Sequence, residues 1–303
     1  MAGCGLIQGL VAGAMLSACV AAAGAQVKVA TLHPLLADLV RQVGGERVEV
    51  VELFKPGGDV HHFEPSAQDL MRMKGAAFIF ASGKHLENYL DNLRDSVGGV
   101  PVIEAGAVVP SIRIQRGQEV FFDEDVDVKS GIDPHWWHSP DNMQRAARLA
   151  GDQLTKADPD GAAAYTAGVA AACKRIAQLK AWAHVRIAAI PKADRKLVTA
   201  HAAFGYFCKE FGFQAMPLLG LSREDEATAR HVAVTVKAIR DNHIRAVFPE
   251  DQANPKILQE IVRETSVKLG EPLVADCTSP HAHTFETMLK YNVEAIVKAL
   301  APQ

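Results

Sequence analysis

Cysteine is scarce in this sequence, and the few cysteines present follow no pairing pattern. Five occur in 303 residues, and only Cys173, Cys208 and Cys277 lie beyond the first 25. An odd number leaves at least one thiol unpaired or bound to another molecule, and no two of them form a CxxC motif. A disulfide framework is therefore not what holds this fold together. A Cys208–Cys277 bridge and buried thiols at these positions both stay open as alternatives.

An excess of charge of one sign and the common catalytic motifs are also lacking. The formal net charge is −3, and no run of Lys and Arg interrupts the chain, so neither nucleic acid nor an anionic membrane surface is an expected partner. There is no HExxH motif and no Ser or Cys nucleophile beside a well-placed histidine, which argues against a hydrolase. With 49% hydrophobic and 22% charged residues in 303, the chain is typical of a globular protein of two domains.

The N-terminal segment lacks charge altogether. Residues 1–25 contain no charged side chain and carry an apolar stretch from Leu10 to Val20, followed by small residues at 23–25. This pattern predicts a signal peptide over residues 1–25, although the usual basic residues at its start are missing, and it is short for a membrane span. Residues 16–19 (LSAC) also resemble a lipobox, which would place a lipid on Cys19. Either processing route predicts a mature protein in the periplasm or on the outer face of the cytoplasmic membrane.

Short apolar runs alternate with longer segments of helical periodicity along the rest of the chain. Such alternation predicts parallel sheets covered by helices. Strands are expected at residues 27–32, 48–54, 76–83, 101–105, 196–200, 214–220, 246–250 and 271–277.

One helical segment is unusually long. It starts at Asp158-Pro159, is rich in Ala, Lys, Gln and Arg, and stops before Pro191, with good start and stop signals at both ends. We therefore expect an α/β protein of two Rossmann-like lobes with parallel sheets, joined by one long rigid helix. The predicted parts are an N-terminal lobe at 26–157, the connecting helix at 158–190 and a C-terminal lobe at 191–303.

Several of the twelve histidines stand just after predicted strands, where open α/β sheets present their ligand-binding groups. His61 follows a glycine-containing turn, His135 ends an Asp-Pro-His triplet, and His201 directly follows a strand, as Asp276 ends another. Three imidazoles and one carboxylate form a four-coordinate set that suits zinc better than a strongly oxygen-preferring ion. Because protons compete for imidazole nitrogen, binding is expected to weaken below about pH 6.5.

These residues lie in a joint pattern that resembles a known family. The pattern comprises GGDVHHFEPS at 57–66, DPH at 133–135, HAAFGY at 201–206, FPEDQ at 248–252 and the loop around Asp276. In order and spacing, from about Val27 to Leu300, it resembles the periplasmic zinc- and manganese-binding proteins of ABC transporters, the cluster A-I solute-binding family, zinc type. The resemblance implies a protein without enzymatic activity that captures a divalent metal ion between its lobes and delivers it to a membrane permease. We expect it to act as a monomer.

The resemblance also implies the site residues. It places metal ligands at His61, His135, His201 and Asp276. His201 favours Zn²⁺ over Mn²⁺, because exchanging an imidazole for a carboxylate would harden the site. Glu250 is expected to orient His201 by accepting its second N–H. Further candidates for outer or auxiliary ligands are His62, His33, His138, His281 and His283.

One departure and two alternatives accompany this interpretation. His138 and Ser139 stand where the family more often has an apolar residue and Asp, so this turn is expected to differ. The alternatives are a manganese- or iron-binding member of the same class and a zinc-dependent hydrolase. Coordination distinguishes the hydrolase, since a catalytic zinc keeps one position open for water, whereas Asp276 would close a binding site.

Overall fold

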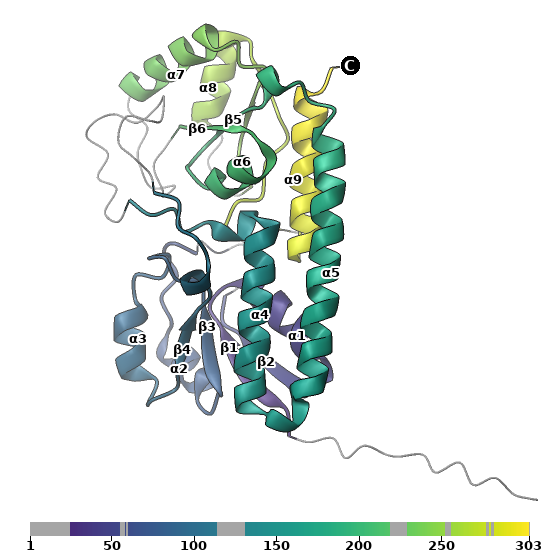
Figure 1. Cartoon of the computed structure of the whole chain (residues 1–303). Helices are drawn as coiled ribbons and strands as arrows, with labels where there is room; N and C mark the ends of the chain where they lie inside the picture. The colour runs from purple at the N-terminus through teal and green to yellow at the C-terminus, as the bar shows by residue number, and fades with distance from the viewer. Residues whose placement is uncertain are drawn as a thin grey trace, which may run out of the picture.

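The computed structural model describes residues 25–54, 58, 60–113, 131–218, 229–251, 256–276, 279 and 282–302. Its two four-stranded parallel sheets, each flanked by helices, form two lobes (Figure 1). The predicted α/β class is thereby confirmed. The predicted signal peptide up to residue 24, together with Cys19, Cys277 and His281, lies outside the described residues.

The N-terminal sheet has the strand order β2-β1-β3-β4. Neighbouring residues of its central strands face opposite cores: Val29 and Phe80 belong to one cluster of buried side chains, Ala30 and Ile79 to another. Burial on both faces explains why these strands are continuous apolar runs in the sequence. The elements of this lobe are β1 (Val27–Thr31), α1 (Pro34–Gly44), β2 (Val48–Glu52), α2 (Ala67–Met73), β3 (Phe78–Ala81), α3 (Leu90–Ser96) and β4 (Val102–Glu104).

The C-terminal sheet repeats this arrangement with the order β6-β5-β7-β8. In its central strand β5, Leu197 and Val198 again face different buried clusters. The elements of this lobe are β5 (Lys196–Thr199), α6 (Gly205–Phe211), β6 (Gln214–Pro217), α7 (Ala229–Asp241), β7 (Ala246–Phe248), α8 (Lys256–Thr265) and β8 (Lys268–Leu269).

The prediction of a last strand at residues 271–277 was wrong. The regular strand is β8, and the following segment makes a single bridge, between Leu273 and Glu250. Pro272 has no N–H to donate to a ladder. The main chain of Leu273 donates to Pro249 and accepts from Asp251, both at 2.8 Å. Leu273 therefore lies beside the end of β7, and residues 274–276 follow without regular strand pairing.

Three helices line one side of the molecule beside the two sheets (Figure 1). They are α4 (Pro140–Ala157), α5 (Ala162–Ile187) and α9 (Phe285–Leu300). The predicted long helix begins later than expected, since a 3₁₀ turn at Pro159–Gly161 precedes α5 and the Asp158 side chain accepts from the Gly161 N–H at 3.2 Å. Helix α5 packs against α1 and α4, which precede it in the sequence, and against α9 at the C-terminal end. The exact lobe boundaries stay a prediction.

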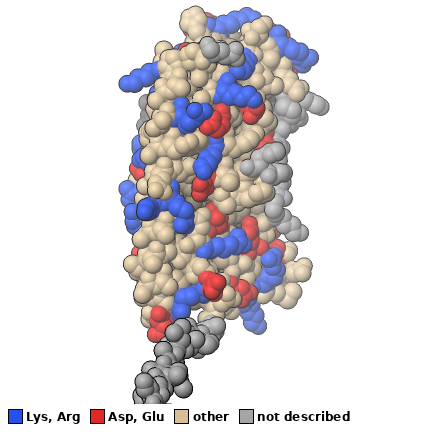
Figure 2. Space-filling view, turned by 90° about the vertical axis from the view of Figure 1, so that its right-hand side faces the viewer, with Lys and Arg blue, Asp and Glu red and all other residues tan. Residues whose placement is uncertain are grey.

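The surface over α5 and α9 carries mixed charge. Figure 2 shows basic and acidic side chains interspersed along this side of the molecule rather than gathered by sign. Among the ion pairs, Arg186 of α5 binds Glu294 of α9 through two nitrogens, at 2.7 and 2.8 Å. In the described part of the chain, no helix combines the length and the apolar character needed to cross a membrane.

Candidate metal centre

Side chains from both lobes meet at one point in the molecule. His61 lies in the turn between β2 and α2, and His135 directly precedes the 3₁₀ turn Trp136–His138 that leads into α4. From the C-terminal lobe, His201 follows β5 and Asp276 lies at a bend in the segment after β8. One potential ligand atom from each of these four residues lies within 4.8 Å of the other three. The structure thus brings together all four residues predicted as metal ligands.

The spacing of these atoms is regular. Nε2 of His135 lies 3.2 Å from Nε2 of His61 and 3.4 Å from Nε2 of His201. Oδ1 of Asp276 lies 3.3 Å from Nε2 of both His135 and His201, and 3.7 Å from Nε2 of His61. Ligand atoms placed about 2.0–2.1 Å from a tetrahedral zinc ion are separated from one another by about 3.3–3.4 Å. Five of the six distances among the four atoms, 3.2–3.7 Å, are therefore close to those expected around one four-coordinate ion, and the ligand atoms of His61 and His201 lie within 4.8 Å of each other.

Two carboxylates fix the orientation of two of the imidazoles. Oδ1 of Asp133 accepts from the main-chain N–H of His135 at 2.8 Å and from its Nδ1–H at 2.9 Å. Glu250 binds His201 in the same way: Oε1 accepts from the main-chain N–H at 2.9 Å, and Oε2 accepts from Nδ1–H. With the proton on Nδ1, each neutral ring presents the lone pair of Nε2 to the other ligands. Both rings are thus set to bind a metal ion through Nε2.

The electrostatics of the centre favour positive charge. Burial lowers the pKa of His201, but the carboxylates of Glu250 and Asp276 outweigh it and raise this pKa to about 10. Burial likewise opposes the contacts of His135 with Asp133 and Asp276, yet the net shift of the His135 pKa is upward. For Asp276, burial raises the pKa, while the three histidines bring it well below its ordinary value. The centre therefore attracts a cation, and in the absence of a metal ion a proton takes that role.

Two of the predicted auxiliary histidines bind the main chain next to Asp276. His33 Nε2 lies 3.0 Å from the carbonyl oxygen of Asp276, and His138 Nε2 lies 2.8 Å from that of Ala275. Trp137 Nε1 donates to the same Ala275 oxygen at 2.9 Å. Burial lowers the pKa of His33 to about 4 and that of His138 to about 3, so both rings are neutral at physiological pH. Their contacts are those of hydrogen-bond donors to the backbone.

The remaining candidates are placed differently. Glu250 binds Nδ1 of His201, the contact expected of a residue that orients this ring, while His62 and His283 are exposed and His281 lies outside the described residues. Asp133 was missed, although its position two residues before His135 in the Asp-Pro-His triplet was the available signal. Close packing holds this carboxylate in place, since a Cβ on Gly205, the first residue of α6, would lie 2.4 Å from Asp133 Oδ2.

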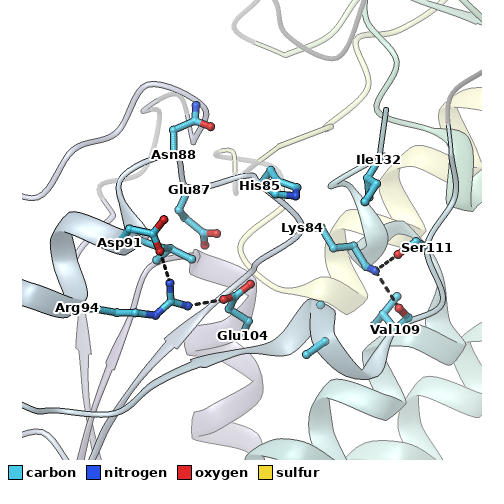
Figure 3. Close-up of a pocket in the computed structure, with 13 residues that line it drawn as sticks. Lys84, His85, Glu87, Asn88, Asp91, Arg94, Glu104, Val109, Ser111 and Ile132 are labelled. Atoms are coloured by element: carbon cyan, nitrogen blue, oxygen red, sulfur yellow. Dashed lines mark hydrogen bonds and ion pairs between the residues drawn. The ribbon is translucent and has the colours of Figure 1, made fainter. Parts of the chain in front are cut away.

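A hollow of about 460 Å³ in the N-terminal lobe is lined by none of the four metal ligands (Figure 3). Its charged groups bind one another or the backbone. Lys84 donates to the carbonyl of Val109 at 2.9 Å, and Arg94 pairs with Asp91 at 2.8 Å and with Glu104. This hollow therefore offers no comparable set of converging ligand atoms.

Residues 29–299 match the family described as "Zinc-uptake complex component A periplasmic". The chain belongs to this family. Relatives include the manganese-binding lipoprotein MntA of Bacillus subtilis (strain 168), 30% identical over 285 residues that cover 91% of this chain and 90% of MntA. The iron-binding protein YfeA of Yersinia pestis is 27% identical over 275 residues, 89% of this chain and 85% of YfeA. Among solved structures, the periplasmic zinc-binding protein TroA of Treponema pallidum matches with a TM-score of 0.79 at 25% identity, covering 92% of this chain and 100% of TroA.

Membership in the zinc-uptake family determines the class of function. The chain is an extracytoplasmic substrate-binding protein of a metal ABC transporter; it binds metal ions, works with a membrane permease and is not an enzyme. The family predicted from the sequence is confirmed, and the alternative of a zinc-dependent hydrolase falls. Because the three relatives are named for manganese, iron and zinc, relatedness leaves the choice of ion open.

Proposed function

We propose that this chain captures Zn²⁺ through His61, His135, His201 and Asp276 and delivers it to the membrane permease of its transporter. The observation that carries the proposal is the spacing of the converging atoms. Nε2 of His135 lies 3.2–3.4 Å from those of His61 and His201, and the three nitrogens lie 3.3–3.7 Å from Oδ1 of Asp276. Four ligands at such distances suit a tetrahedral zinc ion.

The chemical nature of the ligand atoms also supports zinc, in addition to the distances between them. Three imidazole nitrogens and a single carboxylate are a borderline-soft set, whereas manganese prefers oxygen ligands and octahedral geometry. His201 is central to this argument, because Glu250 holds its ring with Nε2 directed at the other ligands. A ligand fixed in this way resists the rearrangement that two additional ligand positions would require.

Manganese or iron is the second candidate. It is favoured by the names of the relatives from Bacillus subtilis and Yersinia pestis, which are 30% and 27% identical to this chain. Histidine sites bind several first-row metals in the order of the Irving–Williams series, so selection also depends on which metals are available.

The route to the extracytoplasmic side is part of the same proposal. The signal peptide over residues 1–25 would be removed, leaving a free protein in the periplasm, or a lipid on Cys19 would hold the mature chain at the outer face of the cytoplasmic membrane. The mass of the mature protein purified from its membrane and soluble fractions distinguishes these two products.

The decisive experiment is a calorimetric titration of the chelator-stripped protein with Zn²⁺ and, separately, with Mn²⁺. We expect one tight zinc site per chain and weaker binding of manganese by at least about tenfold, following the ligand preferences of the two ions. The variant His201→Ala should lose most of the zinc affinity. His283→Ala is the matched control, because it removes an exposed histidine and is expected to bind zinc like the unmodified protein.

Other outcomes have clear meanings. Tighter binding of manganese than of zinc would retain the transport role and overturn the ion. A protein that binds neither metal would show that the four residues are not the ligands.

A further inference from the structure

His33 connects two parts of the chain that are far apart in sequence. It precedes α1 in the N-terminal lobe, and only 1% of it is exposed. Its Nδ1 accepts from the main-chain N–H of Leu35 at 3.2 Å, which is the bond of a helix N-cap. Its Nε2 lies 3.0 Å from the carbonyl oxygen of Asp276, 243 residues further along the chain.

These two partners determine where the ring proton resides. An N–H group can only donate, so the Nδ1 that faces Leu35 must be the acceptor. A carbonyl oxygen can only accept, so the Nε2 that faces Asp276 must carry the proton. A neutral His33 therefore completes both bonds at once and keeps no free lone pair for a metal ion. Of the two roles expected for His33, outer or auxiliary ligand, its contact with the backbone of Asp276 favours the outer one.

The backbone next to Asp276 is held by further ring donors of the same kind. The carbonyl oxygen of Ala275 accepts from Trp137 Nε1 at 2.9 Å and from His138 Nε2 at 2.8 Å. The rings of His33 and Trp137 are in contact, with centroids 4.5 Å apart. Three ring N–H groups from the first half of the chain thus fix two successive carbonyl groups in the second half.

We propose that His33 is a positioning residue for the metal site. By joining the start of α1 to the main chain of Asp276, it keeps the Asp276 carboxylate at the distance from His61, His135 and His201 that one ion requires. The side chain of Asp is short, so a fixed backbone leaves its carboxylate little freedom to move away. The inference rests on the proposed function, because the effect of His33 is observed through metal affinity.

Two substitutions separate the bond to Asp276 from the cap on α1. In His33→Asn, the side-chain oxygen sits as many bonds from Cα as Nδ1 does and remains a good N-cap, but the side chain is too short to reach the Asp276 carbonyl. In His33→Gln, the amide N–H₂ reaches about as far as Nε2. We expect His33→Asn to bind Zn²⁺ about 10- to 100-fold more weakly, as is typical when an outer hydrogen-bond partner of a metal ligand is lost. His33→Gln should bind within about threefold of the unmodified protein, because it restores the bond.

A double-substitution cycle tests whether His33 acts through Asp276. Zinc affinity is measured by competition with a chromophoric chelator for the unmodified protein, His33→Asn, Asp276→Ala and the double variant. If His33 acts by holding Asp276, His33→Asn should change the affinity of the Asp276→Ala protein by less than about threefold. A general structural effect of His33 would weaken binding in both backgrounds alike and would overturn the proposal.

The remaining outcomes also support or overturn the positioning role of His33. Unchanged affinity in a folded His33→Asn protein contradicts the proposal while leaving the zinc site intact. Failure of the unmodified protein to bind zinc counts against the proposed function itself and against this inference with it. If His33→Asn does not fold, the decision rests on His33→Gln: affinity like that of the unmodified protein supports the proposal, and a loss of tenfold or more in a folded protein overturns it.

Discussion

The two lobes share one strand order, but His61 and His201, one proposed metal ligand from each lobe, are held differently. His135 of the N-terminal lobe is bound by Asp133 much as His201 is bound by Glu250. In the C-terminal lobe, His201 lies two residues after the end of β5, both its main chain and its ring bind Glu250, and its side chain is fully buried. In the N-terminal lobe, His61 lies in a turn beside the exposed His62, and 10% of its side chain is exposed. Two lobes of the same topology can therefore hold their histidines with different numbers of contacts and different exposure. We expect His201 to be the fixed ligand and His61 to be the one that an incoming ion reaches from solvent.

The largest expected effect comes from removing one histidine in each lobe. A zinc site held by four ligands is worth about 10–16 kcal/mol, so His201→Ala should weaken zinc binding on the order of 10²- to 10³-fold. His61→Ala should weaken it only about tenfold, since water can take the partly open position. Calorimetry on the two variants measures the difference. Equal losses would remove the distinction between His61 and His201.

A smaller effect is expected from the two carboxylates that orient the rings. Glu250→Gln and Asp133→Asn each disturb the bond to Nδ1 of a histidine ligand, and each should lower zinc affinity about 10- to 100-fold. The exposed Glu260 of α8 supplies the control, because Glu260→Gln makes the same chemical change at a carboxylate that is not among the converging residues. If Asp133→Asn bound zinc normally while Glu250→Gln did not, only the C-terminal histidine would depend on its carboxylate.

The dependence on pH, which needs no substitution, sharpens the comparison most. The carboxylates of Glu250 and Asp276 raise the pKa of His201 to about 10, so zinc must displace a proton from the metal-free site at neutral pH. Apparent affinity should consequently rise with pH by about tenfold per unit between about pH 7 and 9, and fall as the pH falls. This range lies above the value near 6.5 expected for an ordinary imidazole.

Proton release can be counted by calorimetry in buffers of different ionisation enthalpy. Glu250→Gln removes one of the charges that raise the pKa of His201, so it should flatten the dependence above neutral pH. Absence of proton release at about pH 8 would contradict the elevated pKa.

The sequence indicated the fold and the four proposed ligands because both depend on local features. Strands such as β1 and β3 are buried on both faces and therefore appear as unbroken apolar runs. His201 follows another such strand, β5, whereas His61 and His135 were marked by short sequence motifs. The same logic misplaced the strand at 271–277, where Pro272 prevents regular pairing. A local sequence pattern predicts the helix or strand in which it lies, but not the contacts that this element makes with distant segments.

Contacts between residues far apart in the sequence could not be predicted from local sequence patterns. His33 and His138 were predicted as outer or auxiliary ligands without named partners. Their partners lie 243 and 137 residues away and are carbonyl oxygens. Every residue has a carbonyl group, so no residue type in the sequence marks these partners. Asp133 was different, since it lies two residues from His135 and its spacing alone could have suggested the bond.

The anchoring of Asp276 through its main chain has an evolutionary consequence. The bonds from His33, Trp137 and His138 end on carbonyl oxygens, which every amino acid supplies equally. A substitution at position 276 would change the ligand offered to the ion and leave its anchor intact. The protein can therefore explore other metal preferences at this position by single substitutions, without rebuilding the junction that carries it.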